Sequence, residues 1–224
     1  MHIEPGIVDG AKMALSYGTA AAAAGWSLKL VADDLSDHNP RSFVLRTIIA
    51  VVITLFCFEV LPHPPMGVSE VHMIVGTTML LILGVGPAAV GMAAGMAIQG
   101  MIFAPSDLMM YTVNLSTLLF PLFAIHEIAK RTIPAKKAYV DLSYNEVLRL
   151  SVAFQGGIVL WVAFWVFYGQ GFAVWSDVAS FGAAYMLIVL IEPIIDLGAL
   201  AVAKTLRRFE GSGLFVNRLH HPAA

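Results

Sequence analysis

Long apolar segments, each close to the length needed to cross a lipid bilayer, occupy most of this 224-residue chain. A bilayer core of about 30 Å requires roughly 20 apolar residues of α-helix. Apolar residues make up 58% of the chain and charged residues only 12%, whereas soluble chains are about one quarter charged. So few charged side chains cannot cover a water-facing surface. The composition therefore predicts an integral membrane protein and excludes a soluble domain.

Seven segments of the sequence qualify as candidate membrane spans. A chain in lipid must satisfy its own backbone hydrogen bonds, and the alternating pattern of a membrane β-barrel does not occur here. We therefore expect an all-α bundle of about seven transmembrane helices, the third and fourth of them short and tightly connected. The expected spans are Ala11 to Ala32, Phe43 to Leu61, Val68 to Leu83, Pro87 to Phe103, Leu108 to Ala129, Glu146 to Tyr168 and Val178 to Lys204.

The positions of the Lys and Arg residues predict the orientation of this bundle. All 13 of them except Lys12 fall in or beside alternate loops or in the C-terminal tail. Because cytoplasmic loops collect positive charge, we expect an outer N-terminus and a cytoplasmic C-terminus in a multi-pass protein of the cell inner membrane. The expected parts are an N-terminal metal-chelating segment at 1–10, a transmembrane domain at 11–205 and a cytoplasmic tail at 206–224.

His2 is a candidate metal ligand because of its position in the chain. The α-amino group of Met1, the backbone amide of His2 and Nδ1 of its imidazole can close two adjacent chelate rings around one metal ion. Planar nitrogen donors suit Ni(II) and Cu(II), and these three leave one in-plane position open. The alternative is an ordinary residue on a frayed terminus. Taken alone, His2 favours that alternative, so a fourth ligand is needed to support a metal site.

His72 is the candidate for the fourth ligand. It lies at the outer end of the third expected span, with Glu70 two residues before it. Ionisable residues at membrane depth are costly and tend to face a cavity, and the expected topology places His2 and His72 on the same side. The alternative is an interfacial imidazole bonded to a neighbouring carbonyl group.

Four further polar residues are candidates for support or gating of this site. Ser69 and Glu70 are positioned to orient the imidazoles, as residues around metal ligands commonly do, although Glu70 equally suits a solvated loop. His63, beside three prolines in an outer loop, suits a structural or an entry role. Asn114 suits a hydrogen bond to the N-terminal segment or an ordinary interhelical hydrogen bond.

Several segments carry a family resemblance: Met1-His2-Ile3-Glu4-Pro5-Gly6, Gly67-Val-Ser-Glu-Val-His72-Met-Ile-Val-Gly76, Leu83-Gly-Val-Gly-Pro87, Ala97-Ile-Gln99-Gly-Met-Ile-Phe103, and Asn114 ahead of Pro121. The first resembles the MHIPDG start of the CbiM/NikM family, and the second resembles its G-T-S-x-H block. The resemblance covers residues 1 to about 125, and the last two spans match only in hydropathy and position. Members of this family are substrate-binding (S) components of energy-coupling-factor transporters for cobalt and nickel.

The resemblance implies a metal site formed by Met1, His2 and His72, with a nickel or cobalt ion as the transported substrate. The ligand atoms implied are the terminal amine, the amide and imidazole of His2, and the imidazole of His72. The spacing between Gly67 and His72 is one residue longer than in the family block. Three positions also depart from the family pattern: Pro5, Glu70 and Tyr111.

The function that follows is uptake of a divalent metal ion by an energy-coupling-factor ABC transporter, in which this chain captures the substrate and is not an enzyme. The chain has no G-x-x-x-x-G-K-[ST] motif, which binds nucleotide phosphates. ATP hydrolysis is therefore expected on partner ATPase subunits, linked through a transmembrane coupling protein. A small accessory membrane subunit is a further candidate partner, and no nucleic acid is expected.

The departures leave a second hypothesis open, in which the chain is a scaffold or interaction subunit of another membrane complex without metal transport. A third hypothesis is an intramembrane enzyme in which His72 and Glu70 use a metal-activated water. Four filled in-plane positions would leave no equatorial site for that water, so the enzyme hypothesis is disfavoured.

Overall fold

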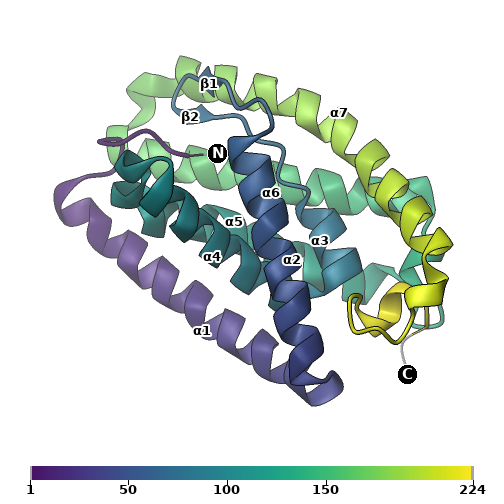
Figure 1. Cartoon of the computed structure of the whole chain (residues 1–224). Helices are drawn as coiled ribbons and strands as arrows, with labels where there is room; N and C mark the ends of the chain where they lie inside the picture. Colours follow the sequence, from purple (N-terminus) through teal and green to yellow (C-terminus); the bar gives the residue numbers. More distant parts are fainter. Residues whose placement is uncertain (1, 223–224) are drawn as a thin grey trace.

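The computed structural model describes residues 2–222 of the chain (Figure 1). These residues form a helical bundle, as predicted, with one small hairpin of β1 (Pro65–Met66) and β2 (Ser69–Glu70). The seven α-helices in this part of the chain are α1 (Met13–Asp37), α2 (Pro40–Glu59), α3 (Gly76–Leu83), α4 (Val85–Ile102), α5 (Tyr111–Thr132), α6 (Tyr144–Gln170) and α7 (Trp175–Thr205).

Five of these helices, α2, α4, α5, α6 and α7, are long and apolar enough to cross a membrane. Their apolar side chains are partly exposed on the outside of the bundle; Leu160 and Leu190, for example, are 73% and 66% exposed. In a membrane such side chains contact lipid, where they carry no penalty. These helices therefore make the chain a multi-pass membrane protein.

The third expected span, Val68 to Leu83, is not a continuous helix, and this expectation was wrong. Only its second half is helical, as the eight-residue α3, and its first half is strand β2 followed by extended chain. Val75, the residue before α3, has a φ of +49°, so the right-handed helix cannot extend further toward the N-terminus. A Cβ on Gly76 would lie 2.2 Å from the ring of Phe154, so α3 begins where a glycine allows close contact with α6. An apolar run by itself does not distinguish a helix from buried extended chain.

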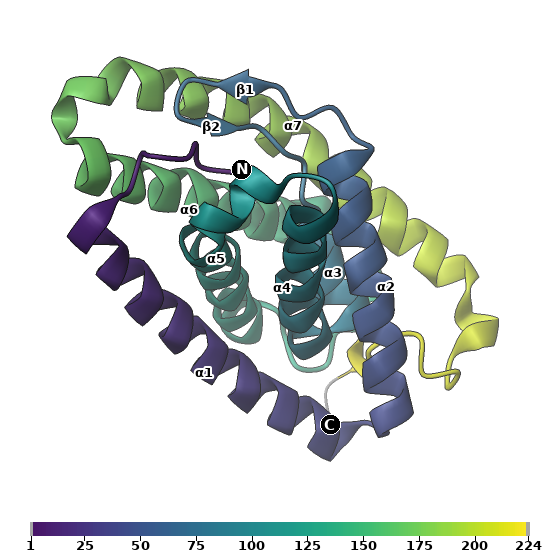
Figure 2. The ribbon, with the colours of Figure 1, turned by 60° about the vertical axis from the view of Figure 1, so that its left-hand side comes forward.

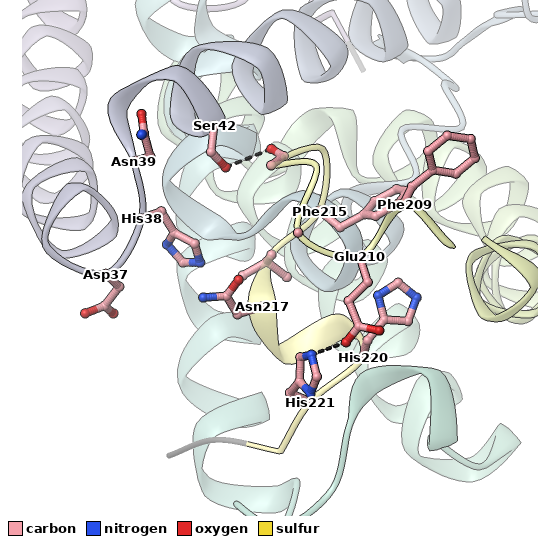
Figure 3. Close-up of a pocket in the computed structure, with 13 residues that line it drawn as sticks. Asp37, His38, Asn39, Ser42, Phe209, Glu210, Phe215, Asn217, His220 and His221 are labelled. Atoms are coloured by element: carbon pink, nitrogen blue, oxygen red, sulfur yellow. Dashed lines mark hydrogen bonds and ion pairs between the residues drawn. The ribbon is translucent and has the colours of Figure 1, made fainter. Parts of the chain in front are cut away.

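The first and the last described residues pack at opposite ends of the bundle (Figure 2). The N-terminal residues lie beside the hairpin, near the end of α2. The C-terminal tail lies against the start of α2, where Ser42 Oγ donates to Gly213 O (2.7 Å). This contact borders a cavity of about 420 Å³ between the tail and the α1–α2 connection, where Glu210 pairs with His221 (Figure 3).

A buried ion pair joins three helices at the end of the bundle where the tail packs. Arg46 on α2 is fully buried, and its Nη2 and Nη1 donate to the Asp34 carboxylate on α1 at 2.6 and 2.9 Å. Arg46 Nη1 also donates to Leu83 O at the end of α3 (2.6 Å). A buried guanidinium needs such partners because desolvation of a charge is costly. We call this group the Arg46 lock.

Two buried carboxylates on α7 connect this helix to α6 and α3. Gln155 Nε2 donates to Glu192 Oε2 (2.6 Å), and Ser151 Oγ donates to Asp196 Oδ2 (2.6 Å). The Thr78 hydroxyl donates to the other oxygen of Asp196. Polar side chains commonly join helices in this way within membrane bundles. These bonds position α3, the helix that follows the segment containing His72.

Candidate metal centre

The N-terminal segment lies against the hairpin as an additional strand. His2 O accepts hydrogen bonds from Glu70 N (3.1 Å) and Ser69 Oγ (3.0 Å), and Ile3 pairs with Ser69 in antiparallel fashion. The side chain of Ile3 is 1% exposed, so burial of apolar surface holds the strand in place. Ile3 N donates to Asn114 Oδ1 on α5 (3.0 Å). Residues 2 and 3 are therefore not a frayed terminus.

The end of α6 supports the residues that follow this strand. Gln170 Nε2 donates to the carbonyl oxygens of Gly6 (3.0 Å) and Ile7 (2.8 Å). Lys12 Nζ donates to Gly169 O (2.6 Å). A Cβ built on Gly169 would lie 2.0 Å from Ile7 O, so only glycine allows this close approach between the two backbones.

Replacement of Gly169 by Ala is expected to displace the N-terminal segment from α6. The clash is with backbone atoms, which cannot rotate away, and overpacking of this kind costs about 1–3 kcal/mol. Hydrogen exchange of the amides of residues 3–8, followed by mass spectrometry, should show faster exchange than in the wild type. Gly156→Ala is the matched control on the same helix, because a Cβ there meets nothing within 4 Å. Equal exchange in all three proteins would contradict this packing role.

Three imidazoles and one carboxylate meet beside this strand. Glu70 Oε2 lies 3.2 Å from His2 Nδ1, 3.5 Å from His72 Nε2 and 3.9 Å from His63 Nδ1. One ligand atom from each of His2, Glu70 and His72 lies within 4.8 Å of the other two. The His63 ring stacks on the His72 ring with centroids 5.0 Å apart. The structure thus brings together four of the residues that the sequence singled out.

The four side chains differ in their access to solvent. His2 and His72 are buried, at 5% and 1% exposure, whereas the side chains of Glu70 and His63 are 28% and 41% exposed. An ion from solution would therefore meet the carboxylate and His63 first, and the two buried imidazoles afterwards.

Burial and neighbouring groups shift the protonation of this cluster. Burial lowers the pKa of the His72 imidazole far below its usual range, and nearby His2 and His63 lower it further. Burial alone would raise the pKa of Glu70, but its hydrogen bond and charge interaction with His2 outweigh burial and lower that pKa. A neutral imidazole and an ionised carboxylate are the forms that bind metal ions.

Three residues that contact the site were missed from the sequence. Asp107 Oδ2 lies 3.6 Å from His2 Nδ1, and Tyr185 OH donates to His72 O (3.1 Å). The Phe58 ring lies 5.0 Å, between centroids, from each of the rings of His2 and His72. The sequence signal for Asp107 was its place in an expected outer loop. Tyr185 and Phe58 lie inside apolar helices, where no local pattern distinguishes them from other aromatic residues.

Met1, the expected source of the terminal amine, lies outside the described residues. Of the two His2 ring nitrogens, Nδ1 faces Glu70, whereas Nε2 is buried without a hydrogen-bond partner in residues 2–222. The nitrogen that a terminal chelate requires is therefore the one that points toward the carboxylate.

A multi-pass helical protein with a histidine- and carboxylate-lined cluster at one end of the bundle has the features of a membrane metal-binding protein. The family model described as the cobalt uptake substrate-specific transmembrane region (CbiM) matches residues 2–209. The chain belongs to this family, as its sequence resemblance predicted. The match also covers α6 and α7, for which the resemblance rested only on hydropathy and position.

Membership places the chain among the membrane components of cobalt uptake. The family is one of transport components, which agrees with the prediction that the chain is not an enzyme. Comparison with curated proteins and with solved structures gives no match.

Proposed function

We propose that this chain is the substrate-capture component of an energy-coupling-factor transporter and binds a divalent ion, Co²⁺ or Ni²⁺, beside His2 and His72. The observation that carries this proposal is the convergence of two buried imidazoles and a carboxylate, with ligand atoms within 4.8 Å of one another. Imidazole nitrogen suits transition metals, whereas Mg²⁺ and Ca²⁺ prefer sites made of oxygen atoms. The cobalt-uptake family of the chain supports the same substrate class.

The proposed ligands are the amine of Met1, the amide and Nδ1 of His2, and Nε2 of His72. Ser69 and Asn114 act as positioning residues, because they bind the backbone of His2 and Ile3 and fix the strand beside the hairpin. His63 stands on the route of entry, since its ring is the most exposed of the cluster. Binding requires Nδ1 of His2 to exchange its hydrogen bond with Glu70 for a bond to the metal.

We further propose that this end of the bundle faces the outside of the inner membrane. The support comes from charge, because α5 starts beside the site at Tyr111 and ends at the opposite end with Lys130 and Arg131. Lys204 similarly lies in the last turn of α7. Positive charge collects on the cytoplasmic side, so the site lies on the outer side.

The energy for transport is proposed to come from other chains. The sequence carries no G-x-x-x-x-G-K-[ST] motif, which P-loop ATPases use to hold nucleotide. Partner ATPase subunits, acting through a transmembrane coupling protein, supply that step in this proposal.

Titration of the purified chain with Co²⁺ and Ni²⁺, followed by isothermal titration calorimetry, tests the proposal. We expect one ion per chain with a Kd of about 1 μM or tighter, since four-ligand sites reach binding free energies of about 10 kcal/mol and more. Mg²⁺ should give no comparable binding. If neither transition metal binds the folded chain, the proposal is wrong.

A further inference from the structure

We propose that Glu70 supplies an axial oxygen ligand to the bound ion and thereby raises the affinity of this site for Co²⁺ relative to Ni²⁺. This inference rests on the proposed function, because it assigns one more ligand, and a selectivity, to the same metal site. It adds a residue outside the nitrogen donors of the proposed chelate.

The distances around Glu70 fit those between neighbouring ligands of one metal ion. Bonds from transition metals to nitrogen and oxygen are about 2.0–2.2 Å, so two ligands at a right angle lie about 3 Å apart. Glu70 Oε2 lies 3.2 Å from His2 Nδ1 and 3.5 Å from His72 Nε2. One carboxylate oxygen is thus a near neighbour of both imidazole nitrogens of the proposed complex. Shifts of a few tenths of an ångström would bring these atoms to the separation of about 3 Å expected for neighbouring ligands.

The order of the nitrogen donors assigns Glu70 to the axial position. In the proposed complex the amine, the amide and Nδ1 of His2 occupy three successive corners of a plane. Nε2 of His72 takes the fourth corner, next to Nδ1. A further ligand at a right angle to both imidazole nitrogens can lie only above or below this filled plane. The carboxylate of Glu70 therefore caps one face of the ion.

The backbone holds Glu70 in this place. Glu70 N donates to His2 O (3.1 Å), so one hydrogen bond fixes the two residues relative to each other. Glu70 also pairs with Pro65 across the hairpin. Its side chain remains 28% exposed, which gives an incoming ion access to the carboxylate. The position is built into the strand register and does not depend on a flexible loop.

An axial carboxylate changes the relative affinities of the site for Co²⁺ and Ni²⁺. Four planar nitrogens without an axial ligand favour Ni(II), which becomes low-spin and diamagnetic in a square plane. A fifth, anionic oxygen ligand removes this advantage, because five-coordinate Ni(II) with such a ligand is high-spin. Co(II) accepts five ligands readily. The carboxylate also makes the complex neutral, since it and the deprotonated amide balance the two charges of the ion.

The experiment compares the wild type with Glu70→Gln and Glu70→Ala, each titrated with Co²⁺ and with Ni²⁺ by calorimetry. In Glu70→Ala we expect the affinity for Co²⁺ relative to Ni²⁺ to fall about tenfold or more, the size of effect seen when groups around a metal are removed. Proton NMR should show paramagnetic shifts in the Ni²⁺-loaded wild type and a diamagnetic spectrum in Ni²⁺-loaded Glu70→Ala. Asp177→Asn is the control, because Asp177 is exposed and its backbone lies beside Gly67, at the same end of the bundle.

Four outcomes would overturn the inference. If the Ni²⁺-loaded wild type is diamagnetic, or if the ratio of the Co²⁺ affinity to the Ni²⁺ affinity is unchanged in Glu70→Ala, Glu70 is not an axial ligand. Either result leaves the proposed metal capture intact. A wild type that binds neither ion overturns both proposals. Glu70→Gln keeps the size of the side chain and the backbone bond to His2 but removes the negative charge. If the charged carboxylate is the ligand, the affinity of this variant for Co²⁺ relative to Ni²⁺ must also fall. If Glu70→Gln folds and behaves as the wild type does, the charge of the carboxylate has no role.

Discussion

An extension of two residues ahead of Met1, Gly-Ser for example, is expected to weaken binding of Co²⁺ and Ni²⁺ by about a hundredfold or more. A structural site with four ligands gains about 10–16 kcal/mol in total, or about 3 kcal/mol per ligand, and 1.4 kcal/mol is a factor of ten. The extension moves the amine away from His2 and so removes at least one ligand and its chelate ring. Calorimetry on the wild type and the extended chain measures the difference directly.

Two added residues are needed, because a single one would place His2 third and build a new chelate from the amine, two amides and the imidazole. The matched control carries the same Gly-Ser after Ala224, because the last described residues before it, through Pro222, pack at the opposite end of the bundle from His2. Both extended chains should keep the helical content of the wild type in circular dichroism. If the N-terminal extension binds both ions as tightly as the control, the side chains alone hold the metal and the terminal chelate is wrong.

The long spans of this protein could be predicted from sequence because each is a continuous apolar run. The expected span Phe43 to Leu61 corresponds to α2 (Pro40–Glu59), and Glu146 to Tyr168 corresponds to α6 (Tyr144–Gln170). The ends differ by a few residues, since caps decide them locally; Asn39, for instance, accepts a hydrogen bond from Arg41 N at the start of α2. Hydrophobic length therefore predicts the element, and capping predicts its boundary.

The third span could not be predicted, because distant residues decide its conformation. Residues 68–70 extend so that they pair with the N-terminal strand, and Val71 N donates to Pro64 O at the open end of the hairpin. No local pattern in an apolar run reveals that another strand lies beside it. The polar residues Glu70 and His72 were the signal that this run differs from a plain lipid-facing helix.

The site was foreseeable in part for a similar reason. Chelate chemistry and the family resemblance singled out His2 and His72 without any knowledge of packing. The central place of Glu70 depends on the register of β2, and a slip of one residue would turn its side chain to the other face. Asp107 reaches His2 only through the packing of α4 and α5. Sequence reasoning thus predicts candidate ligands, whereas their distances follow from the tertiary fold.

Replacement of Asp34 by Ala in the Arg46 lock is expected to lower the free energy of unfolding by about 3–5 kcal/mol, the cost of leaving one buried charge without its partner. Arg46 is fully buried, and its guanidinium donates two hydrogen bonds to the Asp34 carboxylate. Unfolding of the detergent-solubilised protein by SDS, followed by circular dichroism, measures the loss. Asp37→Ala is the control at the end of the same helix, because Asp37 is exposed and surface changes usually stay within about 0.5 kcal/mol.

The double variant Asp34→Leu, Arg46→Met separates the unpaired charge from the lost packing. Replacing a whole buried ion pair by apolar side chains is often neutral or stabilising, so the double variant should recover most of the loss. A cost below about 1 kcal/mol in Asp34→Ala would show that water or another acceptor reaches the guanidinium. In the Arg46 lock, Arg46 Nη1 donates to Leu83 O, which lies at the end of α3 that is farther from His72. Its loss should therefore reduce the folded fraction while the folded chains keep their affinity for Co²⁺, and a parallel loss of affinity would show that α3 transmits the change to the metal centre.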